Sequence, residues 1–152
     1  MLGAGYADRG GVMRKCGNCR ECCTVLGHSM SPWRTKCEHE CLKGCAIYKN
    51  RPSECVEFAC AWLMGHLPRK DRPDLSGIIM TSEDTAFGET LVLHETRANA
   101  HRRGRGAVLV ELVARESGTQ PAILKMHDGT SRMLNRATLT AAMGVLQKAG
   151  KE

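Results

Sequence analysis

The chain of 152 residues lacks several features that define large protein classes. No stretch approaches the roughly 18 consecutive apolar residues of a membrane-spanning helix, so we expect none. Residues 1–15 lack the apolar segment of a secretory signal, which favours a cytoplasmic protein. The glycine-rich loop of P-loop nucleotide-binding proteins is also missing. The remaining composition, with 42% hydrophobic and 25% charged residues, is typical of a globular domain of ordinary size.

Cysteine is concentrated in one part of the chain. All nine cysteines lie between Cys16 and Cys60, and the 92 residues that follow contain none. Such density indicates a disulfide framework or a metal site. An odd number, a cytoplasmic setting and short C-x-x-C spacing favour metal, because this spacing lets two thiolates converge on one ion. Disulfides and inert thiols remain alternatives at this point.

The first half of the chain shows little regular periodicity. Residues 16–50 have neither a helical nor a strand pattern, so we expect loops ordered by ligands. A helix is predicted over 53–65, with Ser53 as its N-cap and apolar residues at helical spacing. Gly65 and Pro68 are expected to end it.

The second half has ordinary apolar segments. Strands are expected over 77–81, 90–95, 121–126 and 130–134, and helices over 106–115 and 136–148. Asp128-Gly129 predicts a type I′ turn between the last two strands. The expected fold is α+β: a small irregular metal-organised cysteine module with one helix, followed by two β-hairpins and two helices. We divide it into a flexible arm (1–15), the cysteine module (16–66) and a supporting region (67–152) packed with the module as one unit.

The order and spacing of the cysteine motifs are specific. The pattern is CxxCxxCC from Cys16, then Cys37-x-His39, then GCAIYxxRPxxCxxFxCxWL from Gly44. It resembles the YkgJ-type family of zinc- or iron-chelating cysteine-cluster proteins, over about residues 16–80. The resemblance implies a metal-binding module whose ligands are Cys16, Cys19, Cys22, Cys23, Cys37, Cys45, Cys55 and Cys60. A similar cluster accompanies flagellin lysine methylases, where an iron–sulfur cluster is the suggested occupant.

Other residues near the motifs have secondary roles in this interpretation. Cys41 departs from the family pattern and is either a free thiol or a substitute ligand, and His39 is either an additional ligand or a polar loop residue beside the site. Tyr48 and Arg51 are expected to pack around or brace the site. Eight thiolates suffice for two four-thiolate zinc ions, which is the favoured occupancy, and an iron–sulfur cluster is the alternative.

We predict the function from this cysteine cluster, because we recognise no set of catalytic residues elsewhere in the sequence. Closed four-thiolate sites are structural, so we expect no stand-alone enzyme but a metal-binding protein that presents a surface to an unknown protein partner. An iron–sulfur protein in electron transfer, redox sensing or a methylase-type system is the alternative. A nucleic-acid-binding zinc module is the second alternative, based on the basic runs at 68–72 and 101–105. No aromatic residue interleaves these runs, so solvated loops are the favoured interpretation.

Overall fold

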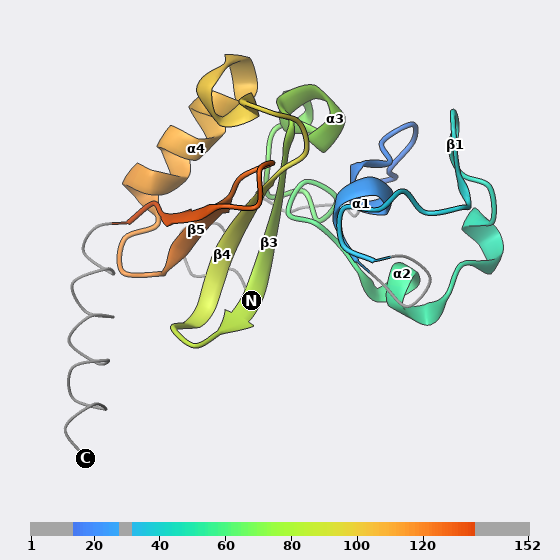
Figure 1. Cartoon of the computed structure of the whole chain (residues 1–152), viewed down its shortest axis with the longest axis horizontal. Coiled ribbons are helices and arrows are strands. Elements are labelled where there is room, and N and C mark those ends of the chain that lie inside the picture. The colour runs from blue at the N-terminus through green and yellow to red at the C-terminus, as the bar shows by residue number, and fades with distance from the viewer. Residues whose placement is uncertain (1–13, 28–31, 136–152) are drawn as a thin grey trace.

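The computed structural model describes residues 14–27 and 32–135, which form the expected α+β fold. Figure 1 shows a region of short helices and strands, which we call the cysteine part, beside a sheet covered by one longer helix, which we call the sheet part. The first part contains α1 (Glu21–Val25), β1 (Glu40–Cys41), β2 (Gly44–Cys45), η1 (Tyr48–Asn50) and α2 (Ser53–Glu57). The connection contains η2 (Arg69–Asp71) and α3 (Pro73–Ser76). The sheet part contains β3 (Ile78–Thr85), β4 (Gly88–Glu95), η3 (Ala100–Arg102), α4 (Gly104–Glu116), β5 (Ala122–Lys125) and β6 (Ser131–Met133).

The four-stranded sheet has the order β3-β4-β5-β6. Strands β3 and β4 form an antiparallel hairpin in which Ile78 pairs with Glu95 and Thr85 with Gly88. Helix α4 then crosses over the sheet, so that β5 runs parallel to β4, and β6 returns antiparallel to β5. Both predicted hairpins and the predicted helix over 106–115 are present. The first hairpin is longer than its apolar segments because polar residues extend each strand to eight residues.

The turn between β5 and β6 differs from the prediction. The N–H of Gly129 donates to the carbonyl of Met126 at 3.0 Å, and Gly129 has a φ of +89°. Asp128 does not have the positive φ that a type I′ turn requires, so this is a type I turn followed by a left-handed glycine. The Asp128 carboxylate accepts hydrogen bonds from the Thr130 N–H and hydroxyl at 2.9 and 2.6 Å, which holds this conformation.

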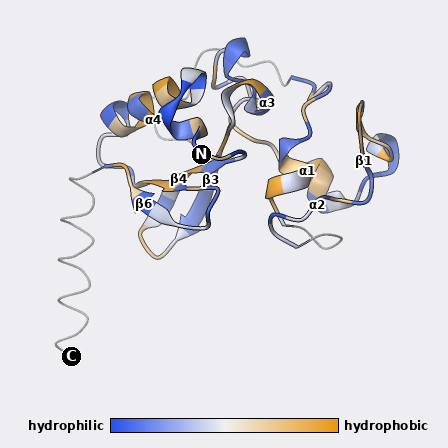
Figure 2. Cartoon of the chain, turned by 45° about the horizontal axis from the view of Figure 1, so that its top comes forward, coloured by the Kyte–Doolittle hydropathy of each residue, from blue (hydrophilic) through white to orange (hydrophobic). Residues whose placement is uncertain are grey.

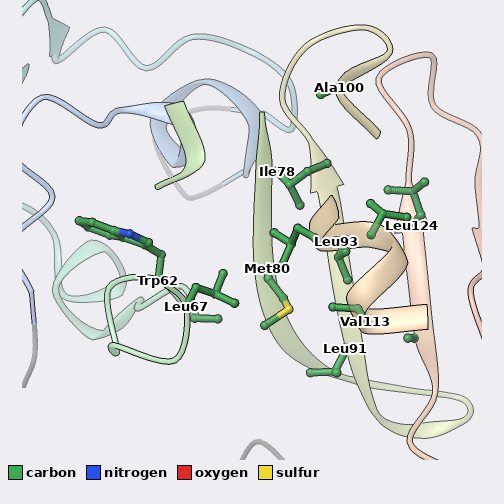
Figure 3. Packing of buried hydrophobic residues seen from close by; sticks show 13 residues of the cluster. Trp62, Leu67, Ile78, Met80, Leu91, Leu93, Ala100, Val113 and Leu124 are labelled. Carbon is green, nitrogen blue, oxygen red and sulfur yellow. The ribbon is translucent and has the colours of Figure 1, made fainter. Parts of the chain in front are cut away.

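The hydrophobic core lies between one face of the sheet and α4. Figure 3 shows side chains of β3, β4 and β5 directed toward α4, and Val113 of α4 packs against them. Orange and blue bands along α4 in Figure 2 show the amphipathic pattern that this packing requires. Trp62 and Leu67, which follow the last cysteine, also belong to this cluster. The end of the cysteine-rich segment therefore packs into the same core as the sheet.

The predicted single helix over 53–65 is wrong in length. Helix α2 ends at Glu57, and Phe58 already has an extended backbone. The N–H of Ala61 donates to the carbonyl of Met80 at 2.8 Å, and the Trp62 indole donates to the carbonyl of Arg69 at 3.2 Å. These tertiary contacts override the helical spacing of the apolar residues. Pro52, rather than the predicted Ser53, occupies the N-cap position of α2.

The first part also holds more regular structure than expected, because α1, η1 and the β1–β2 pair accompany α2. The predicted helix over 136–148 and most of the predicted flexible arm over 1–15 lie outside the described residues. Of the helices in the described ranges, none has both the length and the apolar character needed to cross a membrane.

Candidate metal centre

A cavity of about 560 Å³ lies in the first part of the molecule. Eight cysteines line it: Cys16, Cys19, Cys22, Cys23, Cys37, Cys45, Cys55 and Cys60. These are the eight that the family resemblance implies as ligands. They come from five places in the chain: the first C-x-x-C turn, α1, the loop before β1, β2 and the segment around α2. The fold thus gathers thiols that are up to 44 positions apart around one space.

The first four cysteines are placed by a tight turn and a short helix. The N–H of Cys19 donates to the carbonyl of Cys16 at 3.0 Å, and Gly17 between them has a φ of +58°. Helix α1 follows and carries Cys22 and Cys23. The N–H of Cys37 donates to the carbonyl of Cys23 at 3.0 Å, which ties the next cysteine-bearing loop to α1.

The β1–β2 turn packs closely against the first C-x-x-C turn. Gly44 has a φ of +116°, and a Cβ at this position would come within 3.0 Å of the carbonyl oxygen of Gly17. A side chain here would push the two turns apart and would also strain the backbone. Glycine at position 44 therefore brings Cys45 beside the turn that holds Cys16 and Cys19.

All nine cysteines lie within the described residues and are free thiols. Burial raises the pKa of Cys19 to about 11 and also raises the pKa values of Cys16, Cys55 and Cys60. A hydrogen bond between neighbours raises the pKa of Cys22, together with burial, and lowers that of Cys23 to about 7. Without a cation, most of these thiols are therefore neutral near pH 7. A bound cation reverses this preference, because thiolates are the form that ligates metals.

The donors suit a metal centre in kind and number, but they are not drawn together in this structure. Among the described residues, no three His, Cys, Asp or Glu side chains lie close enough to hold one ion. Metal binding at the cavity therefore requires the thiols to move inward from its walls. Seven of the eight cysteines are only partly buried, and their elements are short, so the surrounding chain offers little resistance to such a movement.

The two additional ligand candidates differ in position. Cys41 is the one cysteine of the described chain that does not line the cavity, and its carbonyl accepts a hydrogen bond from Arg20 at 2.8 Å. His39 does line the cavity, and its Nε2 lies 3.5 Å from the carboxylate of Glu38. The position of His39 on the cavity wall is therefore compatible with a ligand role, whereas the position of Cys41 is not.

Tyr48 and Arg51 form a pair on the cavity wall. The Arg51 guanidinium lies over the Tyr48 ring, 4.0 Å from its centroid, and both residues line the cavity. The pKa of Arg51 is raised first by its hydrogen bond with Tyr48, with smaller contributions from the neighbouring Cys16 and Cys45. The buried Nε of Arg51 has no hydrogen-bond partner among the described residues. This placement fits the bracing role expected for the pair.

Sequence reasoning missed much of the cavity wall. Apolar side chains of Leu26, Ile47, Val56 and Ile79 line it together with the thiols. Ile79 belongs to β3, far from the cysteines in sequence, and no motif signals its role. Arg14 also lines the cavity, but its guanidinium donates to the carbonyl of Leu67 at 2.7 Å and so serves packing as well as charge.

Comparisons of the chain with protein-family models, with curated proteins and with solved structures found no match. The resemblance to the YkgJ-type family therefore stays a prediction from the motifs.

Proposed function

We propose that the chain is a metal-binding protein whose eight cavity-lining cysteines hold two zinc ions, each bound by four thiolates. The observation that carries this proposal is that eight of the nine cysteines line one cavity, although they are dispersed over 45 residues. Four-thiolate coordination is typical of structural zinc sites, which keep no open position for a substrate. The protein then acts by presenting a metal-ordered surface to a partner, not by catalysis.

The charges around the cavity support this occupancy. Each zinc ion bound by four thiolates carries a formal charge of −2, so two such sites need compensating cations. Four basic residues line the cavity, and Glu54 is the one carboxylate residue among its described lining residues. The basic residues are Arg14, Lys15, Lys43 and Arg51. Their positive charge offsets that of the two sites and lowers the cost of gathering eight thiolates.

An iron–sulfur cluster is the second candidate, and the size of the cavity favours it. Zinc–thiolate bonds of about 2.3 Å require little free volume, whereas this cavity measures about 560 Å³. Its wall combines thiols with apolar side chains such as Leu26 and Ile47. All-cysteine ligation is typical of such clusters, whose reduction potential depends on the solvent exposure that a wall of this kind sets. A chain with this occupant would serve electron transfer, redox sensing or a methylase-type system.

Elemental analysis and an absorption spectrum of anaerobically purified protein distinguish the two occupants. The proposal expects a colourless protein with about two zinc ions per chain. A brown protein that contains iron and acid-labile sulfide would overturn the zinc assignment and support the second candidate. A protein that retains neither metal under these conditions would refute both.

Single substitutions test which thiols hold the metal. Cys19→Ser and Cys55→Ser should lower metal content and thermal stability together, because both side chains line the cavity. Cys41→Ser is the matched control, since Cys41 lies outside the cavity wall and should leave both quantities unchanged. Equal metal loss in all three variants would contradict the assignment of the eight ligands.

A further inference from the structure

Two basic segments that are separate in sequence lie side by side on the surface of the sheet part. They are residues 68–76, around η2 and α3, and residues 97–105, around η3 and the start of α4. The Arg105 guanidinium forms a two-point ion pair with the buried carboxylate of Asp71, at 2.7 and 3.1 Å. Arg97 donates to the carbonyls of Asp74 and Leu75 at 3.0 and 2.9 Å. Figure 1 shows α3 beside the start of α4, on the side of the sheet that faces α1.

These two segments carry most of the net charge of the protein. They contain seven Lys or Arg residues and two Asp residues, which gives them five of the chain's six excess positive charges. Both carboxylates are already paired, Asp71 with Arg105 and Asp74 with Arg72 at 2.6 and 2.8 Å. The remaining cations are all exposed: Arg69, Lys70, Arg97, Arg102 and Arg103. We refer to these five residues as the basic surface.

A cavity of about 260 Å³ opens within this region. Arg97, Arg103 and Arg105 line it together with Gly104, the first residue of α4, and no described lining residue is acidic. Because Asp71 pairs with Arg105, the positive end of the helix dipole adds to the charge of two guanidinium groups, those of Arg97 and Arg103. The shape and charge of this hollow therefore suit an anionic group such as a phosphate.

We propose that the basic surface binds the phosphate backbone of duplex nucleic acid. The proposal goes beyond metal binding and rests on five cations that do not line the cysteine cavity. Five exposed cations from two segments offer several contacts, which fits a polymer of phosphates better than one small anion. The segments contain no aromatic residue, so they lack the stacking platforms typical of single-strand binding. Leu75 is their one exposed large apolar side chain, which gives little area for insertion into a membrane.

Binding to duplex DNA over a range of salt concentrations tests the proposal. The probe is a fluorescein-labelled duplex of about 20 base pairs, titrated with the metal-replete full chain between about 50 and 200 mM NaCl. The test variant is Arg102→Gln/Arg103→Gln, because both side chains are exposed and neither is placed in the metal site. The matched control is Lys36→Gln/Lys49→Gln, which removes the same charge from exposed positions of the cysteine part.

The expected result is weak binding that does not depend on base sequence and is sensitive to salt. Arg102→Gln/Arg103→Gln should reduce the slope of log K against log salt by about 2 and weaken binding about tenfold or more at low salt. The control pair should leave the slope unchanged. An equal loss in both pairs would show a general charge effect and overturn the proposal. So would absence of binding, or binding to anionic lipid vesicles that is tighter than binding to the duplex and equally sensitive to Arg102→Gln/Arg103→Gln.

Discussion

The cysteine part and the sheet part of the described chain differ in what holds them together. In the cysteine part, through residue 60, helices α1 and α2 have five residues each and β1 and β2 have two. Helices this short are not stable by themselves, and Val25 and Cys37 are the only buried hydrophobic residues described there. The sheet part has eight-residue strands, a 13-residue helix and a continuous apolar core. Apolar burial therefore orders the sheet part, and the proposed metal sites would supply the stabilisation that the cysteine part lacks.

Metal removal should have the largest effect, because it should unfold the cysteine part and leave the sheet part folded. Structural zinc contributes on the order of 10 kcal/mol to the folding of small zinc modules, so the cysteine part should lose its structure when metal is chelated. The sheet part should remain folded because its core consists of apolar side chains, and Cys60 is the one proposed ligand that packs against it. Amide hydrogen exchange before and after chelation measures this: protection should disappear at Cys23 and Cys37 and persist in β3 and β4.

Readdition of zinc to the chelated protein is the control for irreversible damage, and it should restore protection in the cysteine part. If protection at Cys37 survives complete metal removal, the two parts do not differ in this way, because the cysteine part would then be stable without its ligand. Simultaneous loss in both parts would mean that they form one cooperative unit.

A core substitution should produce the converse effect. Leu93 of β4 is fully buried in the apolar cluster, so Leu93→Ala should destabilise the sheet part by about 2–5 kcal/mol. Because Leu93 does not line the cysteine cavity, the metal content of the purified variant should match that of the wild type. Urea denaturation gives the first quantity and elemental analysis the second. Val108→Ala, at a half-exposed position on α4, is the surface control and should cost far less.

The same difference explains which parts of the fold were predictable from sequence. Alternating and helical apolar patterns locate β3, β4 and α4, because burial against a core imposes those periods. They do not reveal that β5 runs parallel to β4, which depends on the crossover of α4. The apolar spacing of Ala59, Trp62 and Leu63 gave a wrong prediction of helix. Their packing is set by partners such as Met80, which lie far away in sequence.

For the candidate site, the resemblance to the YkgJ-type family singled out eight cysteines, and the fold places these eight around one cavity. Spacing alone indicated only that a tight turn such as the one over Cys16–Cys19 could direct two thiols to one ion, and it did not select the eight. The wall contributed by Ile79 could not be found in the same way, because it depends on how the sheet docks against the cysteine part.

Arg34 links the two parts, and its removal should give a moderate effect. Its guanidinium donates to the carbonyls of Glu95 and Met126 at 3.1 and 2.9 Å and stacks on Trp33 at 4.5 Å. Arg34→Gln would leave two carbonyls at the sheet without this donor, at a cost of about 1–3 kcal/mol. Hydrogen exchange should then show faster exchange in the loop that carries Cys37. Arg132→Gln, at an exposed position of β6, is the matched control, and an equal effect there would contradict the linking role.

The smallest expected effect is a pH dependence that belongs to the sheet part. His94 of β4 is buried, and its Nε2 lies 2.7 Å from Glu83 of β3, with Lys125 of β5 and Arg34 also nearby. Burial lowers the pKa of His94, and the charges of Lys125 and Arg34 lower it further, although Glu83 opposes this shift. The unfolded chain therefore takes up the proton first as pH falls below the ordinary value of 6.5. The contribution of neutral His94 to stability is complete above that pH and is lost progressively below it.

His94→Gln tests this contribution, because it removes the titrating group. Urea denaturation between about pH 7.5 and 5.5 should show that wild-type stability falls more steeply than that of His94→Gln. His127→Gln, in the exposed β5–β6 turn, should retain the wild-type slope. If the proposed metal sites are occupied, protonation of their thiolates in acid affects all three proteins alike, so the difference in slope isolates His94. Equal slopes in wild type and His94→Gln would contradict the contribution of His94.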